Sequence, residues 1–178
     1  MSQSVKIATI LPYKENYTFH KAQAAAIWVC DFFKYSKFKN TNYIFGNTKG
    51  NDYLTKNYIN ISINNLKSKF SSSTSEYCKN FIKKTKNNNF DIIEIHNRPL
   101  VFNYLKNEID SKYILYFHND PLSMNGSKSI NERLKLLDEL DKIIFVSKWV
   151  QNRFFEKLDD KLINKTEVVY PSIHKENK

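Results

Sequence analysis

Short apolar runs alternate with amphipathic segments along the chain. Seven runs have the composition of strands, over residues 5–11, 43–45, 58–61, 90–95, 113–117, 142–146 and 167–170. In the first amphipathic segment, from Phe19 to about Tyr35, apolar residues recur at helical spacing. Strands that alternate with helices are typical of βαβ units and a parallel sheet. The pattern predicts one α/β domain of the Rossmann-like, doubly wound kind, with about seven mostly parallel strands and helices on both faces.

Start signals predict the remaining helices. Ser73, with Glu76 three residues later, predicts a capping box and a helix that runs to about residue 86. Pro99 stands where the first turn of the next helix begins. A long loop over 118–128 leads to a helix that Ser129 caps together with the glutamate three residues on, and a last helix is predicted over 148–158. We expect residues 1–173 to form the domain and residues 174–178 to begin a linker or tail.

The net charge of +10 admits three kinds of partner: nucleic acid, an anionic membrane surface and phosphorylated ligands. The basic residues are mostly Lys, spread among many Asn and Tyr, which is the composition that A/T-rich codons produce. No recognition helix, RRM or zinc signature accompanies the charge, so nucleic acid is not expected as a partner. An anionic membrane face remains open.

Composition and targeting signals indicate a cytoplasmic protein. No stretch approaches the roughly 18 apolar residues that a membrane span needs, and the N-terminus lacks the features of a signal peptide. Cys30 and Cys78 have neither metal-ligand spacing nor a CxxC pairing, so we expect reduced, buried thiols and no metal. We expect a cytoplasmic location, with a peripheral position at the inner face of the membrane as the open alternative.

Polar residues directly follow the predicted strands, where ligands bind in open parallel sheets. The loop after the first strand contains Lys14, and the sixth strand is followed by Ser147-Lys148-Trp149. Two neighbouring strands end in similar turns, His96-Asn97-Arg98-Pro99 and His118-Asn119-Asp120-Pro121. Taken singly, each is an ordinary turn or helix start. Taken together at one edge of the sheet, they predict a binding site.

Several of these side chains suit a carbohydrate or phosphate ligand. His118 and Asp120 are the candidate catalytic residues, for hydrogen bonding to a sugar or for general acid/base chemistry. Arg98 can pair with a phosphate or carboxylate. Trp149 can stack on a sugar ring or simply pack. The chain has no glycine-rich phosphate loop and no nucleophile elbow, so no tightly bound cofactor is expected.

Five segments together resemble the N-terminal lobe of bacterial glycosyltransferases of family 4, which have the GT-B architecture. They are KIATILPYKENYTFHKAQAAAIWVCDFF, DIIEIHNRP, YILYFHNDPLSMNGSKS, DKIIFVSKWVQNRFF and VVYPSI. HNRP and FHNDPLSM are similar to the forms in polysaccharide- and lipopolysaccharide-type enzymes. The resemblance implies two Rossmann-like lobes, with a sugar acceptor mainly on this lobe and a nucleotide sugar mainly on the other. It implies a retaining, metal-independent transfer.

The resemblance also implies roles for residues of this chain. The loop after the first strand, up to Gln23, would face the donor phosphates and the acceptor. His118 would contact the transferred sugar or the acceptor near the anomeric carbon. The residues that would line the acceptor side are Asn97, Arg98, Asn119 and Asp120, and Ser147 would close the cleft. His96 is expected at the same binding site from its position directly after a predicted strand.

Two departures from the family pattern bear on activity. The stretch from His20 to Ala24 has no glycine, so the side chain of Gln23 would crowd the close approach of backbone to phosphate. The sequence stops just after VVYPSI, where the family crosses to its donor-binding lobe. We therefore expect this chain to be inactive alone. Two hypotheses stand: the acceptor lobe of a full-length transferase, and a catalytically dead module that binds a glycan or a partner.

Overall fold

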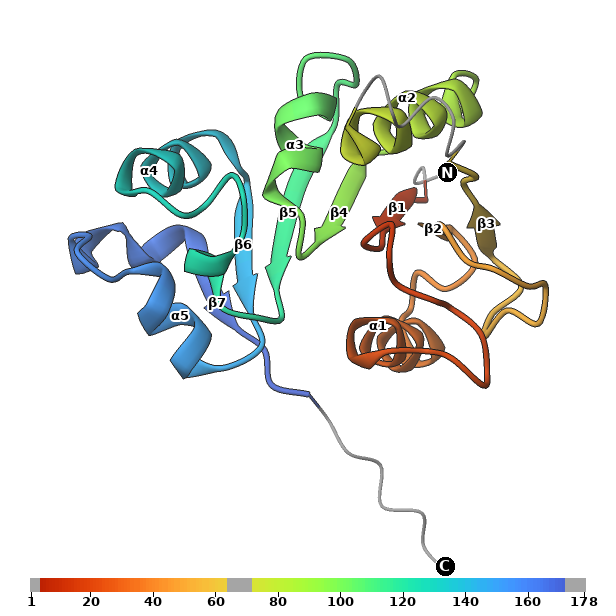
Figure 1. Ribbon diagram of the computed structural model, residues 1–178, viewed down its shortest axis with the longest axis horizontal. Helices are drawn as coiled ribbons and strands as arrows, with labels where there is room; N and C mark the ends of the chain where they lie inside the picture. Colours follow the sequence, from red (N-terminus) through yellow and green to blue (C-terminus); the bar gives the residue numbers. More distant parts are fainter. Residues whose placement is uncertain (1–3, 64–71, 172–178) are drawn as a thin grey trace, which may run out of the picture.

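A computed structural model describes residues 4–63 and 72–171 of the protein (Figure 1). Within them lies a seven-stranded sheet with the order β3-β2-β1-β4-β5-β6-β7, in which every pairing is parallel. The strands are β1 (Ile7–Ile10), β2 (Asn42–Gly46), β3 (Tyr58–Asn60), β4 (Ile92–His96), β5 (Lys112–Phe117), β6 (Lys142–Phe145) and β7 (Thr166–Val168). The α/β prediction is confirmed. Residues 174–178, the predicted tail, lie outside the described residues.

Helices cover both faces of the sheet, as predicted. They are α1 (Ala24–Tyr35), α2 (Ser73–Thr85), α3 (Pro99–Leu105), α4 (Ile130–Glu139) and α5 (Lys148–Phe154), with 3₁₀ turns η2 (Pro121–Ser123) and η3 (Asp160–Lys165). One core cluster contains residues of α2, α3, α4 and α5 together with strand residues such as Leu115 and Phe145. A second cluster joins α1 with Ile44 and Tyr116 on the other face. The two clusters follow from the alternation of side chains along each strand.

The start of α1 differs from the sequence prediction. The helix begins at Ala24 and not at Phe19. Thr18 forms an isolated antiparallel bridge with Tyr53, and its carbonyl accepts from the N–H of Ala22 at 3.0 Å in a turn. The backbone around Thr18 is therefore engaged before the helix can begin.

The cap of α2 and the end of α5 also differ. Ser72 is the N-cap of α2, and its Oγ accepts from the N–H of Ser75 at 3.2 Å, so Ser73 is already helical. Helix α5 ends at Phe154 and not near residue 158, and Lys157 has a φ of 64°, which an α-helix cannot continue. The capping box of Ser129 and the start of α3 at Pro99 are confirmed.

In the part of the chain that the structure describes, no helix combines the length and the apolar character that crossing a bilayer requires.

Candidate functional site

The loops after β1, β4, β5 and β6 lie at one edge of the sheet because these strands are parallel neighbours. Two hollows open there, and we call them together the edge cleft. The larger has a volume of about 900 Å³ and lies along α1, with Gln23 and His118 in its wall. The smaller, of about 490 Å³, includes Arg98. Asn97 and Asn119 line both hollows. The two turns that the sequence singled out therefore meet.

Asn97 holds the turns together. Its φ of 53° is left-handed, a conformation in which Asn is enriched among non-glycine residues. Its N–H donates to the carbonyl of Tyr116 at 2.8 Å. Its Oδ1 accepts from the backbone N–H of His118 at 2.7 Å. The end of β4 thus fixes the start of the loop after β5.

His96 and His118 are in direct contact, with Nδ1 of His96 at 2.8 Å from Nε2 of His118. His96 is 1% exposed and stacks on Tyr116 at 4.5 Å with an interplanar angle of 8°. Trp28 of α1 meets the ring of His118 edge-on at 5.2 Å. His96 therefore lies behind His118 and lines neither hollow of the edge cleft.

Both imidazoles are neutral around pH 7. Burial lowers the pKa of His118 to about 4. Burial, and to a smaller extent the neighbouring His118, lowers the pKa of His96 well below its ordinary value. A group that stays neutral and has a low pKa is a weak general base at pH 7. Of the two chemistries open to His118, the site favours hydrogen bonding.

Asp120 is occupied locally. Its Oδ1 accepts from the N–H of Leu122 at 3.0 Å, and its Oδ2 pairs with Nη2 of Arg153 at 3.1 Å. Burial raises the pKa of Asp120, but the hydrogen bonds from Arg153 and Leu122 outweigh it, and the pKa lies below the ordinary value. Asp120 lines neither hollow and ties the loop after β5 to α5.

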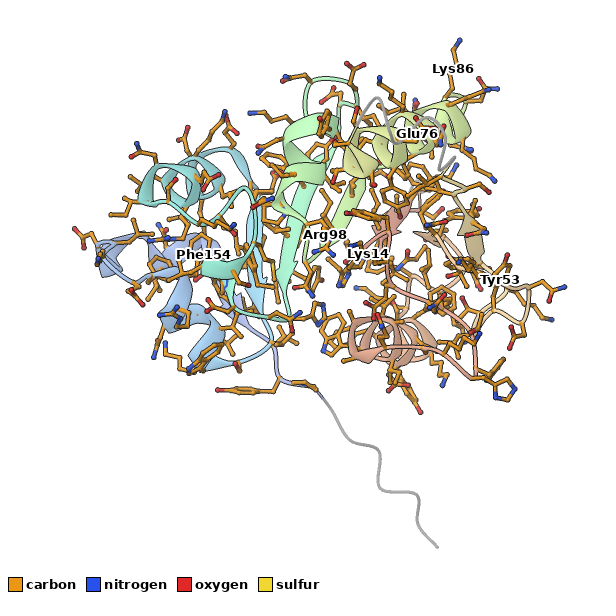
Figure 2. The ribbon with its side chains drawn as sticks, viewed as in Figure 1. Lys14, Tyr53, Glu76, Lys86, Arg98 and Phe154 are labelled. Carbon is orange, nitrogen blue, oxygen red and sulfur yellow. The ribbon has the colours of Figure 1, made fainter. Side chains whose placement is uncertain are left out.

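Two basic side chains lie near the ring of Tyr13 at the edge cleft. The guanidinium of Arg98 lies 5.6 Å from the centre of that ring, and Nζ of Lys14 lies 6.0 Å from it. Figure 2 shows Arg98 and Lys14 on neighbouring segments at this edge of the sheet. Arg98 lines the smaller hollow together with Lys128, whereas Lys14 is exposed beside it.

Two more predicted site residues line neither hollow, in addition to Lys14, His96 and Asp120. Ser147 caps α5, and its Oγ accepts from the N–H of Val150 at 3.2 Å. Trp149 is 59% exposed and lines neither hollow. Val146, the residue before Ser147, lines the larger hollow.

Glu15 has a role that the sequence pattern does not reveal. The side chain is 8% exposed, and its Oε1 accepts from the N–H of Ala26 at 3.1 Å, in the first turn of α1. Burial raises the pKa of Glu15, although bonds from the backbone of Ala26 and Ala25 and the charge of Arg98 oppose the shift. A carboxylate of this chain thus occupies the helix start that would otherwise attract a ligand anion. The only signal for Glu15 in the sequence is its position in the loop after β1.

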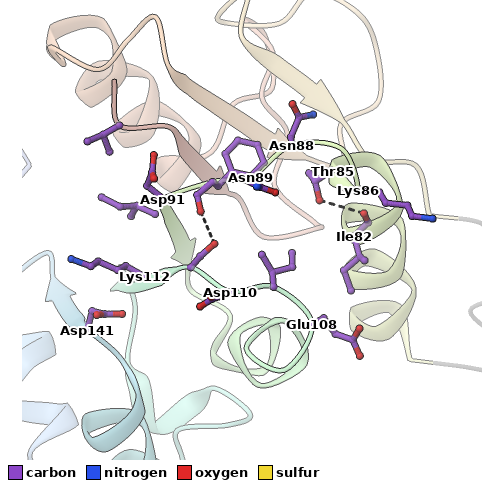
Figure 3. A pocket seen from close by; sticks show the side chains of 15 residues that line it. Ile82, Thr85, Lys86, Asn88, Asn89, Asp91, Glu108, Asp110, Lys112 and Asp141 are labelled. Atoms are coloured by element: carbon purple, nitrogen blue, oxygen red, sulfur yellow. Dashed lines mark hydrogen bonds between the residues drawn. The ribbon is translucent and has the colours of Figure 1, made fainter. Parts of the chain in front are cut away.

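A second large hollow lies at the opposite edge of the sheet, where the strands begin (Figure 3). It has a volume of about 970 Å³ and several acidic side chains. Two of them serve the fold: Asp91 accepts from the N–H of Lys6 at 2.7 Å, and Asp141 accepts from that of Tyr113 at 2.8 Å. These carboxylates satisfy the backbone at strand starts, so this hollow is the weaker candidate.

No group of three or more His, Cys, Asp or Glu residues that could hold a metal ion occurs in residues 4–63 and 72–171. Cys30 and Cys78 are both buried and free. Burial raises the pKa of Cys78 to about 12, which keeps this thiol protonated.

Comparisons with known proteins show the fold. No protein-family model matches the chain, and the curated protein sequences contain no match. A sucrose-phosphate synthase from Thermosynechococcus elongatus has a similar structure, with a TM-score of 0.62 and 11% identity over 93% of this chain and 48% of that chain. A second structure of that synthase gives a TM-score of 0.54 and 10% identity over 93% of this chain and 85% of that chain. The chain spans about half the length of the first of these structures, and it has the Rossmann-like fold of one lobe of a GT-B glycosyltransferase.

Proposed function

We propose that this chain is the acceptor-side lobe of a retaining glycosyltransferase of the family 4 type. The complete enzyme would transfer a sugar from a nucleotide sugar to a glycan or lipid-linked acceptor, as in polysaccharide or lipopolysaccharide synthesis. The observation that carries the proposal is the edge cleft, where Asn97, His118 and Asn119 converge at the carboxyl edge of a glycosyltransferase-like lobe.

The chemistry of the cleft suits a sugar acceptor. Amide and neutral imidazole groups donate to and accept from hydroxyl groups without requiring a charge on the ligand. The larger hollow also has aromatic walls from α1, including Trp28 and Phe32, against which the apolar face of a sugar ring can pack. Arg98 and Lys128 in the smaller hollow suit a phosphate or carboxylate on the acceptor.

The donor belongs to a second lobe in this proposal. The chain spans 48% of the synthase with the similar structure, and a partner lobe would supply the nucleotide-sugar site. The nucleotide sugar is a substrate, and the proposal includes no resident cofactor or metal. The proposed location is the cytoplasm, and the net charge of +10 suits a peripheral position at the inner face of the membrane as the open alternative.

A second candidate function is a catalytically inactive module that binds a glycan or a partner. The specific observation in its favour is the carboxylate of Glu15 at the start of α1, beside Gln23 where the family has glycine. Both features oppose a phosphate at this helix start. This module would bind the acceptor glycan with an affinity similar to that of the transferase lobe, but it would show no turnover.

The test joins this lobe to a donor-binding lobe and measures hydrolysis of the nucleotide sugar and sugar transfer. We expect His118→Ala to lower turnover by about 100-fold or more, the scale of one lost transition-state hydrogen bond. Lys135→Ala is the control, because Lys135 is exposed on α4 and lies outside both hollows. Unchanged turnover in His118→Ala would remove His118 from the mechanism.

Turnover of the joined protein also separates the two functions. Absence of turnover, together with retained glycan binding, would favour the inactive module. If Gln23 and Glu15 obstruct the donor phosphates, then Gln23→Gly and Glu15→Gln should each raise turnover, and no gain would refute that obstruction.

A further inference from the structure

Three aromatic side chains, which we call the aromatic row, pack against one another beside the edge cleft. Trp28 comes from α1, His96 ends β4, and His118 follows β5. The rings of Trp28 and His96 have centres 5.7 Å apart, and Nδ1 of His96 lies 2.8 Å from Nε2 of His118. Trp28 also contacts His118, with ring centres 5.2 Å apart, and of the three side chains only Trp28 and His118 line the larger hollow.

Two nitrogens of the row are buried without a protein partner among the described residues: Nε1 of Trp28 and Nε2 of His96. Trp28 is 8% exposed and His96 is 1% exposed. An unmade bond at such a position carries the full desolvation cost of the group. Nε1 of Trp28 can only donate, whereas Nε2 of His96 can donate or accept, depending on its tautomer.

The contact between the histidines allows two proton arrangements. In the first, Nδ1–H of His96 donates to Nε2 of His118, which leaves a lone pair on Nε2 of His96 and a proton on Nδ1 of His118. In the second, Nε2–H of His118 donates to Nδ1 of His96, which leaves a proton on Nε2 of His96 and a lone pair on Nδ1 of His118.

The first arrangement satisfies the buried groups better. It leaves Nε2 of His96 as an acceptor for the N–H of Trp28, and a water in the cavity of about 250 Å³ that both side chains line can bridge the two nitrogens. The second arrangement leaves two buried N–H donors, on Trp28 and on His96, and neither has a hydrogen-bond partner among the described residues. Buried N–H groups without partners are rare in proteins.

We propose that Trp28 and His96 are positioning residues that fix His118 in the Nδ1–H tautomer, so that the edge cleft presents a neutral N–H donor to its ligand. His96 then donates to His118 and His118 donates to the ligand, so that each of these two bonds strengthens the other, and Trp28 acts on His96 through the bridging water. The ligand atom that this donor selects is an oxygen acceptor, such as a sugar hydroxyl or ring oxygen. The identity of the ligand rests on the proposed function, whereas the tautomer does not.

Other contacts hold the row in place. The stack of His96 on Tyr116 restrains the ring of His96, and Oδ1 of Asn97 restrains the backbone of His118. Nδ1 of His118 has no hydrogen-bond partner among the described residues and is not one of the buried unpartnered atoms. It is therefore available to a ligand in the larger hollow.

The test is a long-range ¹H–¹⁵N spectrum of the protein labelled in its histidine rings, recorded at pH 7.5, where both rings are neutral. This spectrum identifies which nitrogen of each ring carries the proton. We expect Nδ1–H on both His96 and His118, in an excess of at least about fivefold, the lower end of what one unmade buried hydrogen bond is worth. The exposed His20 provides an internal reference. An Nε2–H form of His118 would overturn the proposal.

Variants test each member of the row. Trp28→Phe removes the donor and keeps an aromatic ring, so the excess of Nδ1–H on His118 should fall. His96→Asn places an amide that can donate near the position of Nδ1, and it should keep the Nδ1–H form, whereas His96→Leu should lose it. If the tautomer of His118 is unchanged in Trp28→Phe, Trp28 has no part in the proposal. If it is unchanged in His96→Leu, His96 has none. Amide shift dispersion verifies that each variant is folded.

A titration with an oligosaccharide separates this inference from the proposed function. A protein that shows the Nδ1–H tautomer but binds no glycan would retain the inference and lose the proposed function. A protein that binds the glycan with His118 in the Nε2–H form would retain the function and lose the inference.

Discussion

Asn97 connects the backbone of two strand ends through one residue. Its left-handed backbone turns the chain after β4, and its side chain bonds to the backbone of His118. Replacement by alanine removes the bond and leaves a Cβ in a conformation that costs an L-residue about 1–2 kcal/mol. Replacement by glycine removes the bond alone.

We therefore predict that Asn97→Ala is less stable than Asn97→Gly by about 1 kcal/mol, because glycine adopts the left-handed conformation freely. The free energy of unfolding in urea measures the difference. Equal stabilities would show that the backbone of residue 97 carries no strain that glycine relieves.

Glu94 lies in the centre of the sheet without a cation. Its carboxylate contacts the hydroxyls of Thr9 at 2.7 Å and Tyr116 at 3.2 Å, and the structure shows no ion pair to it among the described residues. Burial raises the pKa of Glu94 above its ordinary value of 4.5, and the two hydroxyl bonds only partly oppose this.

A raised carboxyl pKa makes the folded state hold its proton to higher pH than the unfolded chain. The stability linked to Glu94 is therefore greatest below pH 4.5 and falls as the pH rises to the pKa of the folded state. We predict that Glu94→Gln loses this decline and gains stability relative to wild type between pH 5 and pH 8. Urea unfolding at pH 5 and at pH 8 measures the free energy of unfolding of both proteins. Glu108→Gln, at an exposed position, is the control. An equal pH dependence in Glu94→Gln and wild type would mean that Glu94 ionises at its ordinary pKa.

At the residue scale, the sequence could place His96 and His118 at one edge of the sheet but could not predict their contact. The contact depends on the register of β4 against β5, in which His96 faces Tyr116. The bond of Glu15 to Ala26 depends likewise on how the loop after β1 folds back over α1. Neither relation leaves a local pattern in the sequence.

At the scale of elements, apolar runs and start signals predicted each of the seven strands and five α-helices of the described residues, but not the two 3₁₀ turns. The predicted N-cap of α2 was wrong because neighbouring residues offer the same signal. Each of the three consecutive serines over 71–73 could cap a helix, and Ser73 was chosen because its spacing to Glu76 fits a capping box. In the structure the cap is one residue earlier, at Ser72.

Paired variants test this position. We predict that Ser72→Ala lowers the free energy of unfolding by about 1 kcal/mol, because the N–H of Ser75 loses its acceptor. Ser73→Ala should have almost no effect. Thermal unfolding of the two variants side by side measures this, and the reverse order would restore the cap that the sequence pattern predicted.

At the scale of the whole molecule, the net charge of +10 supports the proposed place at an anionic membrane surface. We predict that the protein sediments with anionic vesicles at low ionic strength and is released as salt shortens the Debye length below about 8 Å. Vesicles of zwitterionic lipid are the control. Sedimentation with both kinds of vesicle, or with neither, would contradict an electrostatic attachment.

The topology explains why the cleft could be predicted at this scale. Parallel strands present all their carboxyl ends at one edge, so the polar turns after β4 and β5 had to meet. The volume and shape of the hollows could not be predicted, because they depend on the exact start of α1 and on the 3₁₀ turn η2 after β5.

The most direct measurement of the central claim is an amide chemical-shift titration of this protein with acceptor-type bacterial oligosaccharides. We predict shifts that concentrate on Asn97, His118 and Asn119 and on the start of α1 at Gln23, the residues of the edge cleft. The absence of shifts, or shifts centred on Asp91 and Asp141 at the opposite edge, would contradict an acceptor site in the edge cleft.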